Sequence, residues 1–195
     1  MERQLIFPSE LWKTKLNIDN QNLSKFILDL EKDTKNNEIS NIGGWQSKAD
    51  FIFKSELSDL RDKIFKCLNE VANTNAYKED VSFVINNGWA NVNRHKDYNT
   101  SHQHPLSYWS GVYYVKVPEN SGDLYFMDPK TYRTMIVEYP FVKNFNNPSQ
   151  TNHIALKPEE GGFVLFPSYM EHLVRPNLSN EPRISIAINF GLKKN

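Results

Sequence analysis

The sequence predicts a mainly β protein with N-terminal helices, folded as a jelly roll or a related barrel. Two observations predict this class. From residue 81 onward, short β-rich runs alternate with Asn, Gly, Pro and Asp, which is typical of antiparallel strands joined by turns. Before residue 81, two segments carry apolar residues at helical spacing instead. We therefore expect two helices to pack on one sheet of the barrel.

The two expected helices differ in position but share one pattern. In the first, which follows Asp19 or Asn20 as the capping residue, the apolar residues keep an i, i+3, i+4, i+7 spacing: Leu23, Phe26, Ile27 and Leu30. In the second, which begins behind Ser55, the stripe consists of Leu57, Leu60, Ile64, Leu68 and Val71. The intervening segment SNIGGWQSKADF contains two glycines and is predicted to be a loop.

Eight runs in the rest of the chain are predicted strands: VSFVIN, GWANVN, SGVYYVKV, GDLYFMD, TMIVEY, HIAL, GGFVLFP and RISIAINF. At 195 residues the chain is long enough for one sizeable core. We expect a single domain over residues 1–195, in which residues 1–80 form a helical cover and residues 81–195 form the β core.

Charge and composition exclude some classes of partner. The 23 basic and 23 acidic residues cancel to a net charge of +0, which argues against nucleic acid or an anionic membrane as the main partner. No apolar run approaches the roughly 20 residues of a membrane span. The N-terminus lacks a signal-peptide pattern, and a single cysteine allows no intrachain disulfide. These features predict a cytoplasmic protein.

A histidine pair stands out in the segment NTSHQHPLSYWSGVYYV, where His102 and His104 are separated by one residue. In an extended segment, residues i and i+2 point to the same face, about 6.5 Å apart at their Cα atoms. Two imidazoles at that spacing can bind one metal ion. A surface turn that happens to contain two histidines is the alternative interpretation.

Two features near the C-terminus favour the metal site. His172 follows the strand-like run GGFVLFP, and Arg183 and Ser185 then alternate with isoleucines on the next predicted strand. If the Arg183 face points into the barrel, the guanidinium needs a partner, because an unpaired buried charge is very costly. A ligand carboxylate bound by Arg183, with Ser185 adding a hydrogen bond, meets that need.

This combination of a His-x-acid position, a distant histidine and an Arg-x-Ser pair resembles the Fe(II)/2-oxoglutarate-dependent oxygenases, which are built on a double-stranded β-helix. The resemblance extends along nearly the whole chain to a little-characterised subgroup found in bacteria and marine phages. The blocks that carry it are LIFPSELW, SNIGGWQS, WANVN, HQHP, SGVYYVKVP, LYFMDP, FPSYMEHLVRPN and RISIAINF.

The resemblance implies a role for each matching residue. His102 corresponds to the first iron ligand and His172 to the distal one. Arg183, together with Ser185, corresponds to the pair that binds the distal carboxylate of 2-oxoglutarate. Tyr114 corresponds to a tyrosine that reaches the same carboxylate in some relatives, although an aromatic core position explains it as well.

His104 departs from the family pattern, because the usual triad contains two histidines and one carboxylate. Three alternatives are open. His104 is a third nitrogen ligand, which we favour, or it lies outside the coordination sphere, or an acid from elsewhere completes the triad. The candidate acids are Asp97, Asp123 and Asp128. Nearby asparagines are candidates for contacts to a ligand or co-substrate, with turn and strand-end roles as the alternative: Asn91, Asn93 and Asn99.

The implied activity requires Fe(II), 2-oxoglutarate and O₂. Oxidative decarboxylation of 2-oxoglutarate yields succinate and CO₂ while the substrate is oxidised, by default through hydroxylation. The substrate class that the resemblance implies is a protein side chain or a small molecule, with a peptide slightly favoured.

Two alternative functions compete with the oxygenase. One is a cupin-type metal enzyme that does not use 2-oxoglutarate. Gly161, Pro167 and His172 match the second cupin motif, but Tyr169 replaces its second glycine and the first motif lacks its glutamate. The other is a non-catalytic jelly-roll binding protein or phage-associated structural protein, which a histidine at the acid position would favour.

Overall fold

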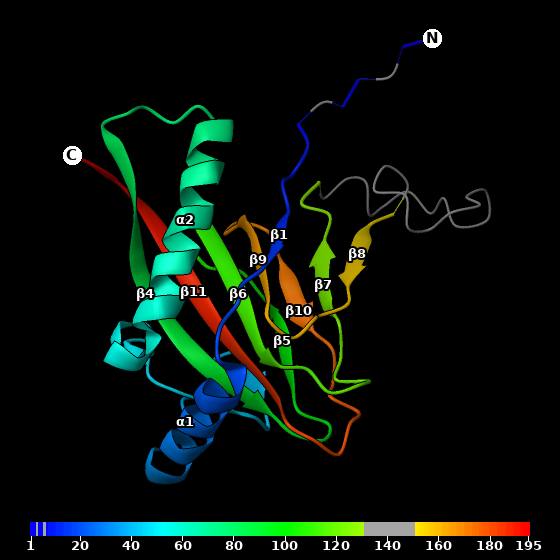
Figure 1. The fold of residues 1–195 in the computed structure, drawn as a ribbon. Helices are drawn as coiled ribbons and strands as arrows, with labels where there is room; N and C mark the ends of the chain where they lie inside the picture. The colour runs from blue at the N-terminus through cyan, green and yellow to red at the C-terminus, as the bar shows by residue number, and fades with distance from the viewer. Residues whose placement is uncertain (3, 6, 131–150) are drawn as a thin grey trace.

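Two antiparallel sheets face each other in the computed structural model, which describes the chain except for residues 3, 6 and 131–150 (Figure 1). The first sheet has the strand order β1-β9-β6-β11-β4-β3 and the second the order β2-β5-β10-β7-β8. The strands of the first sheet are β1 (Trp12–Lys15), β9 (Gly162–Pro167), β6 (Trp109–Lys116), β11 (Arg183–Lys194), β4 (Val81–Asn93) and β3 (Trp45–Gln46). Those of the second are β2 (Asn41–Ile42), β5 (Tyr98–His102), β10 (His172–Val174), β7 (Leu124–Met127) and β8 (His153–Leu156). The predicted mainly β fold is confirmed.

Two helices cover the outer face of the six-stranded sheet (Figure 1). The first, α1 (Asn20–Asp33), begins as predicted, because the Asp19 side chain accepts a hydrogen bond from the Asn22 backbone N–H at 3.1 Å. The second, α2 (Ser58–Thr74), begins later than predicted, because two short 3₁₀ turns, Phe51–Phe53 and Ser55–Leu57, precede it. Both predicted apolar stripes pack against the sheet.

Alternation along the strands separates two cores. Ile184, Ile186 and Ile188 of β11 are fully buried beneath the helices, as the sequence predicts. The opposite faces of the strands enclose a smaller core between the two sheets, made of Tyr114, Leu124, Phe126, Val164, Phe166 and Met170. Polar side chains that alternate with the isoleucines therefore point into the space between the sheets.

Strand β4 is one long strand where the sequence analysis predicts two. It pairs with β11 over its whole length, but the register changes between the pairs Asn189–Asn87 and Phe190–Ile85. Asn86 is thus an extra residue in β4, a β-bulge. Because of the bulge, residues on the two sides of Asn86 alternate out of phase, which explains why the pattern resembled two separate runs.

The first 80 residues also contribute strands to both sheets. Strand β1 pairs with β9, β2 with β5 and β3 with β4, so the N-terminal region covers and extends the β core. The predicted strand TMIVEY lies outside the described residues. Among the residues that are described, no helix is long and apolar enough to cross a membrane.

Candidate metal centre

Three histidines meet in the space between the sheets. His102 ends β5, His172 begins β10, and the two residues are directly paired in the antiparallel register. His104 lies two residues beyond the end of β5, where its backbone N–H donates to the Ser168 carbonyl at 3.1 Å. One ring nitrogen from each histidine lies within 4.8 Å of the other two. The structure therefore brings together all three histidines that the sequence analysis names as metal ligands.

Backbone carbonyls orient two of the three rings. The Nδ1 atom of His102 lies 2.7 Å from the Thr100 carbonyl oxygen, and that of His172 lies 2.9 Å from the Met170 carbonyl oxygen. A carbonyl oxygen can only accept, so Nδ1 is the protonated nitrogen in both rings. The lone pair of each neutral ring then lies on Nε2, which is how metal-binding histidines are usually prepared.

Burial keeps the three imidazoles neutral. It lowers the pKa of His104 to about 4 and that of His172 to about 3, with a smaller contribution in the same direction from His102. Burial likewise lowers the pKa of His102, against the opposing effect of the Thr100 carbonyl. Because only a neutral imidazole offers a lone pair, all three rings have the charge state that metal binding requires at neutral pH.

The donor set fits a divalent transition metal. Imidazole nitrogens suit iron, zinc, copper and nickel ions. Two nitrogens bound at right angles to one ion, each at about 2.1 Å, lie about 3 Å apart. The 4.8 Å limit on the nitrogen separations is somewhat wider than this, so modest ring rotations would bring the three donors to one ion.

No carboxylate joins this cluster in the described part of the chain. Asp97 instead accepts a hydrogen bond from the Arg94 backbone N–H at 2.6 Å. Asp128 accepts one from the Lys130 backbone N–H at 2.9 Å, which is the turn role that the sequence suggests. The acid position of the family pattern is therefore held by His104.

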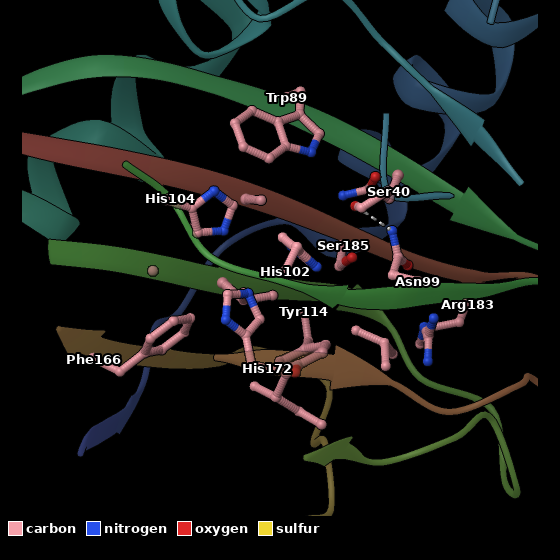
Figure 2. Close-up of a pocket in the computed structure, with 16 residues that line it drawn as sticks. Ser40, Trp89, Asn99, His102, His104, Tyr114, Phe166, His172, Arg183 and Ser185 are labelled. Carbon is pink, nitrogen blue, oxygen red and sulfur yellow. Dashed lines mark hydrogen bonds between the residues drawn. The ribbon is translucent and has the colours of Figure 1, made fainter. Parts of the chain in front are cut away.

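A cavity extends from the histidines between the two sheets, with Arg183 at its other end (Figure 2). Its walls come from both sheets, and sixteen residues line it. Trp89 and Phe166 border the histidine end, where their ring centroids lie 5.7 Å from His104 and 4.8 Å from His172, respectively. A ligand in this cavity would contact the metal position and Arg183 together.

Arg183 is buried without an acidic partner among the described residues. Its side chain is 1% exposed, and its Nη1 donates to the carbonyl oxygens of Ser121 at 2.7 Å and Gly122 at 3.3 Å. Burial lowers the pKa of the guanidinium to about 10, so it remains charged at neutral pH. Two carbonyls hold the group in place and Asp97 acts on its charge only from beyond ion-pair distance, so a ligand carboxylate is the complementary partner.

Ser185 and Tyr114 lie beside Arg183 on neighbouring strands. They form a register pair between β11 and β6, and both line the cavity. Tyr114 also belongs to the inter-sheet core. Its position is therefore compatible with a contact to the ligand carboxylate and with a role as an aromatic core residue. Burial raises the pKa of its phenol to about 12, and the phenol is therefore a neutral hydrogen-bond donor.

The three asparagines named as ligand candidates are all buried near the Arg183 end of the cavity. Asn91 and Asn99 line it, and Asn99 donates to the Ser40 hydroxyl at 3.3 Å (Figure 2). Asn91 Oδ1 and Asn93 Oδ1 have no hydrogen-bond partner among the described residues. A buried carboxamide oxygen without a partner is unusual, and because Asn91 also lines the cavity, it is marked as a contact for a bound molecule.

The sequence analysis did not assign Trp89 or Phe166 to the site, although a local signal for Trp89 exists. Trp89, Asn91 and Asn93 alternate along β4 and face the same side as Arg183 and Ser185. Phe166 has no comparable signal, because every residue of β9 is buried and its two faces look alike.

Comparison with known proteins identifies a family and supports the fold. A family model described as "Putative 2OG-Fe(II) oxygenase" matches residues 87–189, which is more than half of the chain and includes the three histidines and Arg183. No curated protein sequence matches the chain.

Solved structures of oxygenases share the fold at low sequence identity. A prolyl-4-hydroxylase from Pseudomonas putida is 14% identical with a TM-score of 0.60, covering 93% of this chain and 91% of its own. The viral collagen prolyl hydroxylase of Paramecium bursaria Chlorella virus-1, solved with 2-oxoglutarate, is 14% identical with a TM-score of 0.58 and coverages of 92% and 94%. HygX from Streptomyces hygroscopicus, solved with nickel and 2-oxoglutarate, is 10% identical with a TM-score of 0.60 and coverages of 94% and 83%. The predicted oxygenase-type double-stranded β-helix is thereby confirmed.

Proposed function

The chain belongs to the 2-oxoglutarate/Fe(II) oxygenase family whose model matches it, an enzyme class, and from that premise we propose that it is an Fe(II)- and 2-oxoglutarate-dependent hydroxylase. In the proposed reaction, 2-oxoglutarate and O₂ are converted to succinate and CO₂, and the second oxygen atom enters the substrate as a hydroxyl group. The observation that carries the proposal is one cavity with three neutral imidazoles at one end and, at the other, a buried guanidinium that has no ion-pair partner among the described residues.

His102, His104 and His172 would hold the iron. His102 and His172 are prepared for this by their Nδ1 hydrogen bonds to backbone carbonyls. When bound, iron would supply the redox chemistry that links O₂ and 2-oxoglutarate to substrate oxidation. Three neutral ligands would leave the ion with one more positive charge than a two-histidine, one-carboxylate site, which favours binding of the anionic co-substrate.

Arg183 would bind the distal carboxylate of 2-oxoglutarate and so orient its keto-acid end toward the histidines. The carbonyls of Ser121 and Gly122 hold the guanidinium in position before the ligand arrives, which lowers the entropic cost of binding. Ser185 and Tyr114 are hydroxyl donors in the same part of the cavity. Trp89 and Phe166 would exclude water from the histidine end.

We propose a polypeptide side chain as the substrate class to test first, with a small molecule as the alternative. A second cavity of about 620 Å³ lies between residues 4, 5 and 8–11 and the β7–β8 region, and it includes Phe126 and Met170. Phe126 is the register partner of His172, and Met170 provides the carbonyl that orients the His172 ring. The similarity to two prolyl hydroxylases supports a polypeptide, whereas HygX has been solved with hygromycin B, a small molecule.

The proposal is tested by anaerobic titration of the protein with Fe(II) and then 2-oxoglutarate, measuring the charge-transfer absorption that the ternary complex produces. We expect a band in the wild type and none in His102→Ala or His172→Asn. His95→Ala is the matched control, because His95 is exposed and lies outside the cavity. A wild-type protein that retains iron but gives no band and forms no succinate in air would support the 2-oxoglutarate-independent metal enzyme, and one that binds no metal would support the non-catalytic binding protein.

The role of Arg183 has its own test. Arg183→Ala should weaken 2-oxoglutarate binding by about 2–4 kcal/mol, the usual cost of removing a charged hydrogen-bonding partner. Arg94→Ala is the control, since Arg94 pairs with Glu31 on the surface. Equal 2-oxoglutarate affinity in Arg183→Ala and the wild type would mean that another group binds the carboxylate.

A further inference from the structure

Asn189 contacts the histidine that replaces the family's carboxylate. It lies on β11, is 6% exposed, and its Nδ2 is 3.5 Å from His104 Nδ1. We propose that Asn189 is a positioning residue that determines which nitrogen of His104 carries the proton, and thereby whether His104 can bind the metal. This inference rests on the proposed metal site but concerns a residue outside the ligand set.

A chain of buried hydrogen bonds defines the orientation of the Asn189 carboxamide. Ser110 Oγ donates to Asn189 Oδ1 at 2.8 Å, and Asn189 Nδ2 donates to Asn87 Oδ1 at 2.9 Å. Ser110 Oγ also lies 2.8 Å from Ser168 Oγ. Because the single Ser110 proton is used toward Asn189, Ser168 must donate to Ser110. Both serines are almost fully buried, so water does not compete for these groups.

This orientation presents an N–H group to Nδ1 of His104. Nδ1 must then be the unprotonated nitrogen, and the proton of the neutral ring lies on Nε2. His102 and His172 carry their protons on Nδ1 instead. The structure thus shows two rings with Nε2 available to a metal and a third ring whose Nε2 is protonated.

The network can reverse without losing a hydrogen bond. Every member is a hydroxyl or a carboxamide, and each can both donate and accept. A half-turn of the Asn189 and Asn87 carboxamides, with the two serine protons redirected, lets Asn189 Oδ1 accept from a protonated His104 Nδ1. His104 Nε2 is then free to bind the metal. An aliphatic residue at position 189 could not follow this change, and a carboxylate would permit only the metal-binding state.

Two substitutions of Asn189 therefore have opposite expected effects. Asn189→Asp can only accept, so it favours the metal-binding tautomer of His104, and we expect it to tighten Co(II) binding about tenfold. Asn189→Leu removes the partner, and we expect about tenfold weaker Co(II) binding. The readout is titration with Co(II), followed by its visible absorption. Both effects should vanish in a His104→Ala background, which a general loss of packing would not produce.

A second measurement uses only the wild-type protein, so it does not depend on whether a variant folds. In ¹⁵N-labelled wild type without metal, the imidazole ¹⁵N shifts should identify a proton on Nε2 of His104 and on Nδ1 of His102 and His172. Zn(II) should move the His104 proton to Nδ1. A His104 that is already protonated on Nδ1 in the metal-free protein would overturn the inference.

The outcomes separate this inference from the proposed function. If wild type binds Co(II) through His102 and His172 but neither Asn189 substitution changes the affinity, the role of Asn189 is wrong and the metal site stands. If Asn189→Asp tightens binding equally in the His104→Ala background, the new carboxylate binds the metal directly and the inference is again wrong. If wild type binds no Co(II) and no Fe(II), the proposed function itself fails.

Discussion

Acid should destabilise the metal-free protein through its buried histidines. An unfolded histidine has a pKa of about 6.5, whereas in the fold His104 titrates at about 4 and His172 at about 3. Below pH 6.5 the unfolded chain therefore binds protons that the folded protein does not bind. The folded protein therefore loses stability as the pH falls from 6.5 toward the pKa values that the two histidines have in the fold.

The magnitude follows from these values. Between about pH 7.5 and about pH 5.5, each of the two rings stays neutral in the fold and becomes mostly protonated in the unfolded chain, which costs about 1.4 kcal/mol per ring. His104 and His172 together should lower the free energy of unfolding by about 3 kcal/mol over this range. The lowered pKa of His102 acts in the same direction.

Urea denaturation at the two pH values, with a chelator present, measures the effect. His172→Asn should lose about 1.4 kcal/mol less than the wild type on acidification. Asparagine is the chosen replacement because its Nδ2 can still donate to the Met170 carbonyl that His172 Nδ1 contacts. His95→Asn, an exposed control, should behave like the wild type. An acid-induced loss that is identical in His172→Asn and the wild type would refute burial as the cause.

Three further substitutions test separate parts of the structure. Gly122→Ala should destabilise the protein by about 1–3 kcal/mol in thermal unfolding and weaken 2-oxoglutarate binding, because φ is +88° there and the added Cβ would lie 2.1 Å from the Arg175 carbonyl oxygen. Phe166→Ala should cost about 3–5 kcal/mol in urea denaturation and weaken metal binding, since its buried ring packs on His172. Asp19→Ala should cost about 1 kcal/mol through loss of the helix cap while leaving Co(II) affinity unchanged, and a changed affinity would mean that α1 influences the site.

Local signals made several elements predictable. The start of α1 depends on Asp19 and on a stripe of apolar residues a few positions away, so the pattern and the structure agree. The alternation of Arg183 and Ser185 with isoleucines likewise identified the two faces of β11. In both cases the determining interactions lie within one element or between an element and the nearest core.

Other features depend on residues that are distant in sequence. The carbonyls that hold Arg183 come from Ser121 and Gly122, in a turn more than sixty positions earlier, and no local pattern indicates that contact. The contact of Asn189 with His104 depends in the same way on the packing of β11 against the segment that follows β5. The resemblance to a family indicated which residues belong to the site, but the hydrogen-bond partners that orient them required the fold.

The bulge at Asn86 determines which residues of β4 form the cavity wall. The pairing of β4 with the 12-residue strand β11 shows the change of phase. After the bulge, the odd-numbered residues Trp89 and Asn91 face the cavity, whereas before it the odd-numbered residue Ile85 faces the helices. If Asn86 took a regular place in the ladder and the rest of β4 followed the phase of its N-terminal part, Ala90 and Val92 would turn inward. The bulge therefore keeps a polar wall, rather than an apolar one, facing the cavity without changing any amino acid. Deleting Asn86 would place Asn87 directly after Ile85 in regular alternation, so Trp89 and Asn91 would still face the cavity.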